Sequence, residues 1–153
     1  MTQTTTHTVQ SGYQDVQDFH TKYGVPLANA PTLLEGEAYN FRLGFMQEEL
    51  QEFVQANYEG DLAKALDALL DLVYVAYGTA QMMGVPPAMW QEMWDAVQHA
   101  NMSKVRASSA SESKRGTSLD VVKPAGWEGP DRKHQEIIAR YLALANAKAQ
   151  AQA

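Results

Sequence analysis

The sequence predicts an all-α fold, an antiparallel bundle of about five helices. Apolar residues recur at three- and four-residue intervals in five segments, as they do on one face of a helix. Glycine and proline separate these segments, and none shows the alternation of a convincing strand. We expect a single all-α domain over residues 11–150, long enough to bury a core, after a disordered tail at residues 1–10.

The first two helices are bounded by capping and breaking residues. Ser11 is the expected N-cap of a helix over residues 12–23, which ends at Gly24. A long second helix is expected over residues 33–58. Gly44 lies inside it, where glycine costs about 1 kcal/mol relative to alanine, so this position predicts close packing against another helix.

Three further helices complete the expected bundle. The third is expected over residues 62–83. A fourth follows over residues 87–101, because Pro87 suits the first turn of a helix. Asp131 is the expected N-cap of the last helix, over residues 132–148, and the alanine- and glutamine-rich end is expected to fray.

The third helix is strongly apolar, yet two aspartates lie on it. Between residues 65 and 80 the only charged residues are Asp67 and Asp71. Apolar residues cover almost every direction around the axis, so we expect the helix to be buried on all sides. The two aspartates are four residues apart and share one face. A buried carboxylate is costly unless it is paired or bound to a metal, so the pair predicts one of these.

The second helix carries three glutamates, Glu48, Glu49 and Glu52, whose spacing lets them share a face. A short turn joins the second helix to the third, so the glutamates should lie opposite Asp67 and Asp71 in an antiparallel pair. Converging carboxylates raise one another's pKa unless a cation lies between them. Oxygen ligands alone favour Mg²⁺ or Mn²⁺.

Two other interpretations of these acidic residues fit the sequence less well. A Glu-Glu-x-x-Glu pattern on a helix is most often a solvated face, although the two aspartates argue against this because their helix offers no such face. A di-iron carboxylate centre would require Glu-x-x-His pairs on facing helices, and the second and third helices contain no histidine.

Residues 105–130 lose the helical periodicity and differ in charge from the rest of the chain. Five of the twelve basic residues lie in or beside this loop: Lys104, Arg106, Lys114, Arg115 and Lys123. Long loops of this kind often act as functional lids. Basic donors beside metal-bound carboxylates suit a polyphosphate substrate, whereas the alternative is that the loop only balances an acidic surface.

The overall composition excludes several classes of protein. The net charge of −6 argues against general nucleic-acid or membrane-surface binding. There is no cysteine, so no disulfide or thiolate metal site is expected, which fits a reducing cytoplasm. The polar first ten residues do not resemble a signal peptide, and no apolar run is long enough to span a bilayer.

Four motifs occur in a defined order: EELQE, then DALLDLVYVAYGTA followed by Gly-Val-Pro, then HANMSK, then VVKPAGW. Over residues 16–127 this order resembles the MazG-like all-α nucleoside triphosphate pyrophosphohydrolases. The similarity is greatest to short single-domain members, including phage proteins and an enzyme acting on dUTP. The resemblance implies metal-dependent cleavage of (deoxy)nucleoside triphosphates to the monophosphate and pyrophosphate, as nucleotide-pool housekeeping.

The resemblance also assigns roles to the acidic residues. Glu49 and Glu52 match the family's first metal-binding pair, and Asp71 matches the aspartate of a later Glu-x-x-Asp pair. The glutamate of that later pair should fall at position 68, which is Ala68 here. Asp67 is the acid available to replace it, since positions three and four before Asp71 both face its side. Glu48 matches an acidic position beside the metals, where it would orient or deprotonate the attacking water.

Substrate binding and assembly are implied in the same way. Asn101 and Lys104 match a polar pair that contacts phosphate or sugar, and Lys123 and Trp127 match a segment that folds over the substrate. Family members assemble from two subunits, so the resemblance implies a homodimer or a dimer of dimers. Its active site would lie between the second, third and fourth helices and be completed by dimerisation. The alternative is a non-catalytic nucleotide-binding or interaction module on the same bundle.

Overall fold

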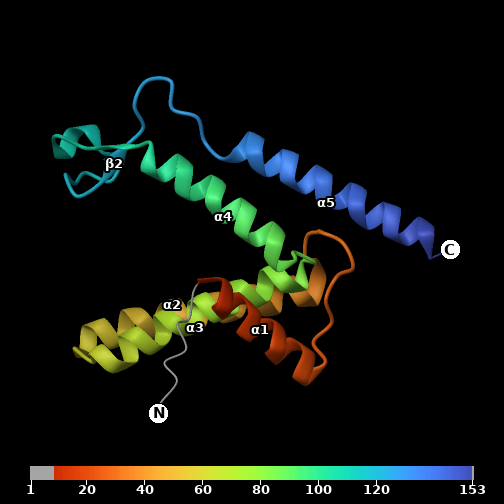
Figure 1. Ribbon diagram of the computed structural model, residues 1–153. Helices are drawn as coiled ribbons and strands as arrows, with labels where there is room; N and C mark the ends of the chain where they lie inside the picture. The colour runs from red at the N-terminus through yellow and green to blue at the C-terminus, as the bar shows by residue number, and fades with distance from the viewer. Residues whose placement is uncertain (1–8, 153) are drawn as a thin grey trace, which may run out of the picture. The chain divides into compact units, whose positions relative to one another are not determined.

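The computed structural model describes residues 9–152 of the chain. Five α-helices make up most of it, which confirms the all-α fold (Figure 1). The elements are α1 (Val9–Tyr23), α2 (Gly36–Glu59), α3 (Leu62–Met82), α4 (Pro87–Met102), β1 (Val105–Arg106), a 3₁₀ turn (Ala110–Glu112), β2 (Val121–Val122) and α5 (Asp131–Ala151). The described chain divides after Pro87 into two compact units. The single domain expected over residues 11–150 stays a prediction.

In the first unit, α2 and α3 form a helical hairpin with α1 against α3 (Figure 1). The chain reverses at Gly60, whose left-handed φ of 73° suits glycine. The Asp61 carboxylate then caps α3 by accepting the backbone N–H of Lys64 at 3.0 Å. Small buried residues on the facing helices, Ala56 of α2 and Ala68 of α3 among them, leave room for close packing.

The expectation that the third helix is buried on all sides is wrong for the chain by itself. Its buried stripe includes Ala65, Ala68 and Val75. The opposite side exposes large apolar residues, namely Leu66, Leu69, Leu70, Val73 and Tyr74. Asp67 and Asp71 are also exposed. The physical reason is that, among the described residues of its unit, α3 packs mainly against α1 and α2, and two neighbours leave one side of a helix uncovered.

Several predicted boundaries also differ from the structure. Ser11 lies inside α1 rather than at its N-cap, because the helix begins at Val9. α2 begins three residues later than expected. No atom outside its local surroundings lies within 4 Å of a Cβ built at Gly44, so the predicted close packing at this position is absent from the described chain. The tail expected at residues 1–10 lies largely outside the described residues, but its last two residues are helical.

The second unit contains α4, a small antiparallel sheet and α5. β1 pairs with β2 through Val105 opposite Val122 and Arg106 opposite Val121, so the loop expected to lack strands holds a short hairpin. α5 starts at Asp131, with Pro130 rather than Asp131 as its N-cap, and it continues through the end that was expected to fray. None of the described helices is both long and apolar enough to cross a bilayer.

Candidate functional site

The α2–α3 hairpin brings the predicted acidic residues of the first unit together. Glu48, Glu49 and Glu52 lie on α2, and Asp67 and Asp71 lie on α3. Glu49 is partly buried, whereas the other four are exposed. The antiparallel hairpin places the middle of α2 beside the first half of α3 because the turn between them is only two residues long.

Glu49 is the electrostatic centre of this acidic cluster. Burial raises the pKa of its carboxyl group, and repulsion from Asp71, Glu52, Glu48 and Asp67 raises it further, in that order. All four neighbours therefore lie close enough for their charge to act on Glu49. Its Oε2 atom is buried and has no hydrogen-bond partner among residues 9–152. A buried acceptor without a donor, surrounded by like charge, is an arrangement that a cation would stabilise.

The acidic cluster fits a hard divalent ion by its chemistry, since every donor is a carboxylate oxygen. Glu49, Glu52, Asp67 and Asp71 are the residues that could hold it. In the part of the chain that the structure describes, no three acidic or histidine side chains are already gathered closely enough to ligate one ion. The carboxylates thus interact without being drawn together, as expected of like charges that repel.

Ala68 stands where the resemblance implies a glutamate, and the structure buries this position. Ala68 is only 2% exposed, so the family's glutamate would have to leave the core at this point. Asp67 is exposed and already acts on the pKa of Glu49. Asp67 is therefore placed to contribute to the acidic cluster, although with a shorter side chain.

A second group of predicted residues meets around Trp127 in the second unit. The Lys104 ammonium donates to Asn101 Oδ1 at 2.8 Å and lies 5.4 Å from the Trp127 ring centroid. The Lys123 ammonium lies 4.3 Å from the same centroid. The indole N–H donates to the Ala100 carbonyl at 2.8 Å and so fixes the ring. Two cations beside one ring, neither with a carboxylate partner among the described residues, suit an anionic ligand.

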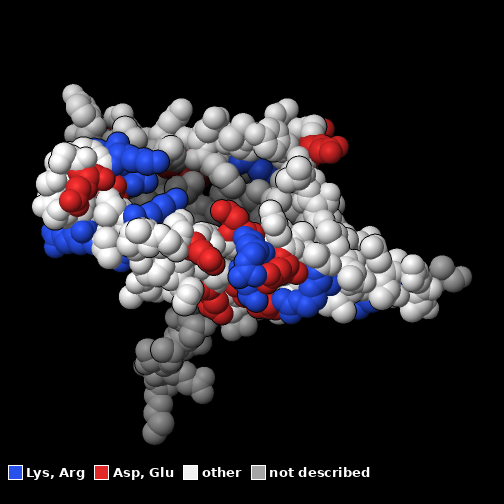
Figure 2. Space-filling model, turned by 90° about the horizontal axis from the view of Figure 1, so that it is seen from above, with Lys and Arg blue, Asp and Glu red and all other residues white. Residues whose placement is uncertain are grey.

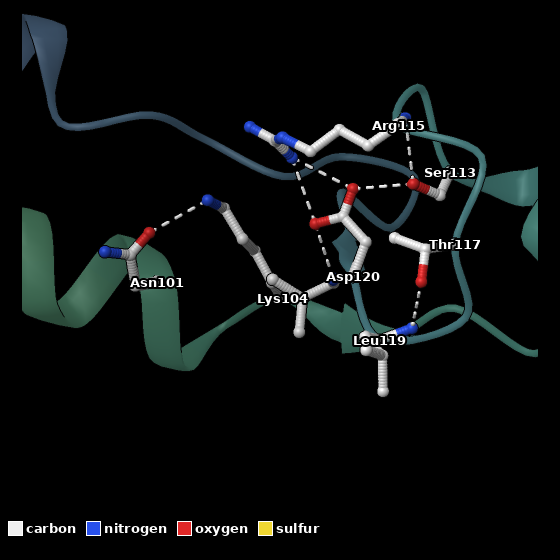
Figure 3. A network of polar contacts seen from close by, with 8 residues as sticks. Asn101, Lys104, Ser113, Arg115, Thr117, Leu119 and Asp120 are labelled. Carbon is white, nitrogen blue, oxygen red and sulfur yellow. Dashed lines mark hydrogen bonds and ion pairs between the residues drawn. The ribbon is translucent and has the colours of Figure 1, made fainter. Parts of the chain in front are cut away.

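The three remaining basic residues make no hydrogen bond, ion pair or ring contact with the Trp127 group among the described residues. Arg115 instead makes two hydrogen bonds to Asp120, at 2.9 and 3.0 Å, and the same carboxylate accepts Ser113 Oγ at 2.7 Å (Figure 3). Arg106 lies on β1, and Lys114 is exposed beside Arg115. Figure 2 shows basic side chains gathered over the β1–β2 end of this unit.

Sequence reasoning missed a pocket in the second unit with a volume of about 760 Å³. It lies between α4 and the segment from Pro124 to Lys133, and Trp127 forms part of its wall. Glu92, Asp95 and His99 line it from one face of α4. Their spacing of three and four residues was a detectable signal, but no partner segment pointed to it. The volume is in the range of small-molecule sites.

The helical fold and the acidic cluster, whose donors are all carboxylates, define an all-α protein with a candidate site for a divalent metal ion. Comparison with known families identifies the class more closely. Residues 16–101, more than half of the chain, match the phosphoribosyl-ATP pyrophosphohydrolase family. The chain belongs to this family, which lies within the MazG-like all-α nucleoside triphosphate pyrophosphohydrolases, so the resemblance drawn from the motifs is confirmed.

The chain is also similar to an uncharacterised protein of Acanthamoeba polyphaga mimivirus. The two are 33% identical over 92 residues, which is 56% of this chain and 36% of the viral protein. The chain thus spans about a third of that relative's length. The family match includes the whole acidic cluster and ends at Asn101, so the segment with Lys104, Lys123 and Trp127 lies beyond it.

Proposed function

We propose that the protein is a metal-dependent pyrophosphohydrolase that cleaves (deoxy)nucleoside triphosphates to the monophosphate and pyrophosphate. The observation that carries the proposal is the acidic cluster, in which four carboxylates act on the partly buried Glu49. Pyrophosphohydrolases of this family generally use divalent metals. We propose Mg²⁺, with Mn²⁺ as a substitute, because both prefer oxygen ligands.

The chain's own residues divide the chemistry between them. Glu49, Glu52, Asp67 and Asp71 would hold the ions, which when bound offset the charge of the triphosphate and acidify a water molecule. Glu48 accepts the proton of the attacking water as it adds to the α-phosphorus. The bond between that phosphorus and the α–β bridging oxygen breaks, and pyrophosphate leaves with the bonding electrons.

We propose that the substrate is held by the basic residues and Trp127. The ammonium groups of Lys104 and Lys123 would offset phosphate charge, with Asn101 orienting Lys104 through its 2.8 Å hydrogen bond. Arg106 and Lys114 would supply further positive charge. Arg115 would act less directly, because Asp120 already binds its guanidinium.

A homodimer, or a dimer of dimers, is part of the proposal. The first unit exposes a run of large apolar side chains on its two longest helices: Leu43, Leu50, Val54, Leu66, Leu69, Leu70 and Val73. Exposed apolar surfaces of this kind mark interaction sites, and a second copy of the chain is the simplest partner. Light scattering should give twice the chain mass or a multiple of it, and Leu70→Glu should shift it toward the monomer.

The alternative function is a nucleotide-binding module without catalysis. The observation that favours it is Ala68, which removes one acidic ligand that the family pattern contains. Binding of nucleotide with Mg²⁺, without any release of pyrophosphate, would support this alternative and reject the enzyme.

The test is pyrophosphate release from a panel of dNTPs, NTPs and phosphoribosyl-ATP, with and without Mg²⁺ or Mn²⁺. We expect metal-dependent release from a subset of the panel. Glu49→Gln and Asp71→Asn should each lower it about 100-fold or more, since metal ions supply several kcal/mol of transition-state stabilisation. Glu37→Gln is the matched control, because Glu37 is an exposed carboxylate in the first turn of the same helix. Equal losses in all three variants would contradict the assignment.

A further inference from the structure

A buried polar junction joins the three helices of the first unit. Arg42 of α2 is only 9% exposed and His20 of α1 only 3%. They meet α3 at Gly78, where a built Cβ would lie 2.8 Å from Arg42 Nη2 and 3.1 Å from His20 Nε2. A guanidinium is seldom buried so deeply, because its desolvation is costly.

Arg42 donates hydrogen bonds to two residues of α3. Its Nη2 donates to the Val75 carbonyl at 2.7 Å, and its Nε donates to Thr79 Oγ1 at 3.0 Å. The Thr79 hydroxyl donates to the same Val75 carbonyl at 2.7 Å, so the guanidinium, the hydroxyl and the carbonyl form a ring of hydrogen bonds. No carboxylate pairs with Arg42 among the described residues. The guanidinium therefore contributes directed contacts between helices rather than an ion pair.

The spacing relates this junction to the acidic cluster. Arg42 lies seven residues before Glu49, on the same face of α2 and about 10 Å along its axis. Val75 lies four residues after Asp71, on the same face of α3. A slip of one residue along α3 would move Asp71 by about 1.5 Å and turn it by about 100°. The two hydrogen bonds from Arg42 to α3 would have to break in such a slip.

We propose that Arg42 is a positioning residue, which fixes the register of α2 against α3 and so sets how Glu49 and Glu52 face Asp67 and Asp71. The proposal rests on the proposed function, since it assigns Arg42 to the same metal centre. Arg42 acts on that centre only through the two helices.

The register can be measured directly because the chain has no cysteine. Gln47→Cys on α2 and Ala63→Cys on α3 place spin labels at two exposed positions. Pulsed electron–electron double resonance then gives the distance between the two labels. The labelled chains are diluted in excess unlabelled protein, so that each measured distance lies within one chain. We expect Arg42→Met to shift or broaden the distance distribution in metal-free protein. Val16→Ala is the control, because it removes buried volume from α1 without removing any of the hydrogen bonds between Arg42 and α3.

The second readout is Mn²⁺ affinity, followed by electron paramagnetic resonance. Arg42→Met should weaken Mn²⁺ binding about tenfold or more, as removal of outer supports does at other metal centres. Val16→Ala should lower thermal stability and leave the affinity within about twofold of the original protein. Thr79→Val removes one acceptor of Arg42 with little change of shape and gives a milder variant, for which we expect a smaller loss in the same direction.

Each outcome decides the proposal. If the distance and the Mn²⁺ affinity of both junction variants match those of Val16→Ala at equal loss of stability, Arg42 is only a stabilising residue and the proposal is overturned. If Arg42→Met does not fold, the Thr79→Val result takes its place. A protein that binds Mn²⁺ but releases no pyrophosphate would reject the proposed function alone. If the original protein does not bind Mn²⁺, the label distances still test the register.

Discussion

The two glycines inside helices of the first unit provide a sharp test of the described packing. A side chain at Gly78 would require the hydrogen-bonded Arg42 guanidinium to move, since an added Cβ would lie 2.8 Å from Arg42 Nη2. Gly44 has nothing within 4 Å of the same built atom. Both lie in helix interiors without positive φ, so alanine gains about 1 kcal/mol of helix propensity at either position. The difference between Gly78→Ala and Gly44→Ala therefore isolates the cost of the clash.

That cost is about 1–3 kcal/mol, the usual range for overpacking a filled site. Gly44→Ala should be about 1 kcal/mol more stable than the original protein, and Gly78→Ala between unchanged and about 2 kcal/mol less stable. At about 2–4 °C per kcal/mol for a chain of this size, their melting temperatures should differ by about 2–12 °C. Thermal unfolding followed by circular dichroism at one protein concentration measures this. Equal melting temperatures, or a higher one for Gly78→Ala, would refute the described packing.

Three further predictions concern other parts of the molecule. Because the pKa of Glu49 is raised, the metal-free fold loses stability as the pH rises through that pKa. Glu49→Gln removes this loss, so its stabilising effect should grow from acidic to neutral pH. Thermal melts in the presence of a chelator measure the effect, and a stabilisation that does not change with pH would contradict the prediction. Trp127→Phe removes the hydrogen bond to the Ala100 carbonyl and should lower the free energy of unfolding by about 1 kcal/mol in urea titrations, whereas an unchanged midpoint would argue against that bond. Asp120→Asn frees Arg115 and should speed tryptic cleavage after it several-fold, and an unchanged cleavage rate would show that this ion pair does not order the hairpin.

Much of the fold was predictable because each helix carries its own boundary signals. Gly60 ends α2 and Asp61 caps α3, and glycine and aspartate are ordinary signals for these two positions. Pro87 opens α4 as predicted. These signals are local, so the sequence alone contains them. The start of α1 was misplaced because a cap-forming residue does not by itself fix a helix start, and α1 begins two residues earlier, at Val9.

The exposed side of α3 was not predictable in the same way. An all-round apolar sequence indicates that every side is suited to burial, but it does not say how many neighbours the chain itself supplies. Leu66 and Leu70 would be core residues if another chain covered them, and they are exposed in one chain. The pattern is a property of the helix, whereas coverage depends on tertiary and quaternary contacts.

The residues of the candidate site were predictable where helix spacing or a family motif links them in the sequence. The acidic residues were found because their spacing places them on facing helices, and Asn101, Lys104, Lys123 and Trp127 were found from the family motifs. Arg115 was grouped with the substrate-binding residues on charge alone. Its contact with Asp120 depends on a turn that charge counting cannot foresee. The polar junction was missed for a related reason, because Arg42 and Thr79 are 37 positions apart.

The small residue at position 68 has a consequence for how this chain could be altered. Ala68 lies in the buried seam of the hairpin, so the spacing of the two helices limits which side chains can stand at this position of the acidic cluster. A glutamate at this position would reach the acidic cluster only if the seam opened to admit it, because an enclosed carboxylate is strongly disfavoured. Adding an acidic residue here would thus require a second, compensating change in the packing.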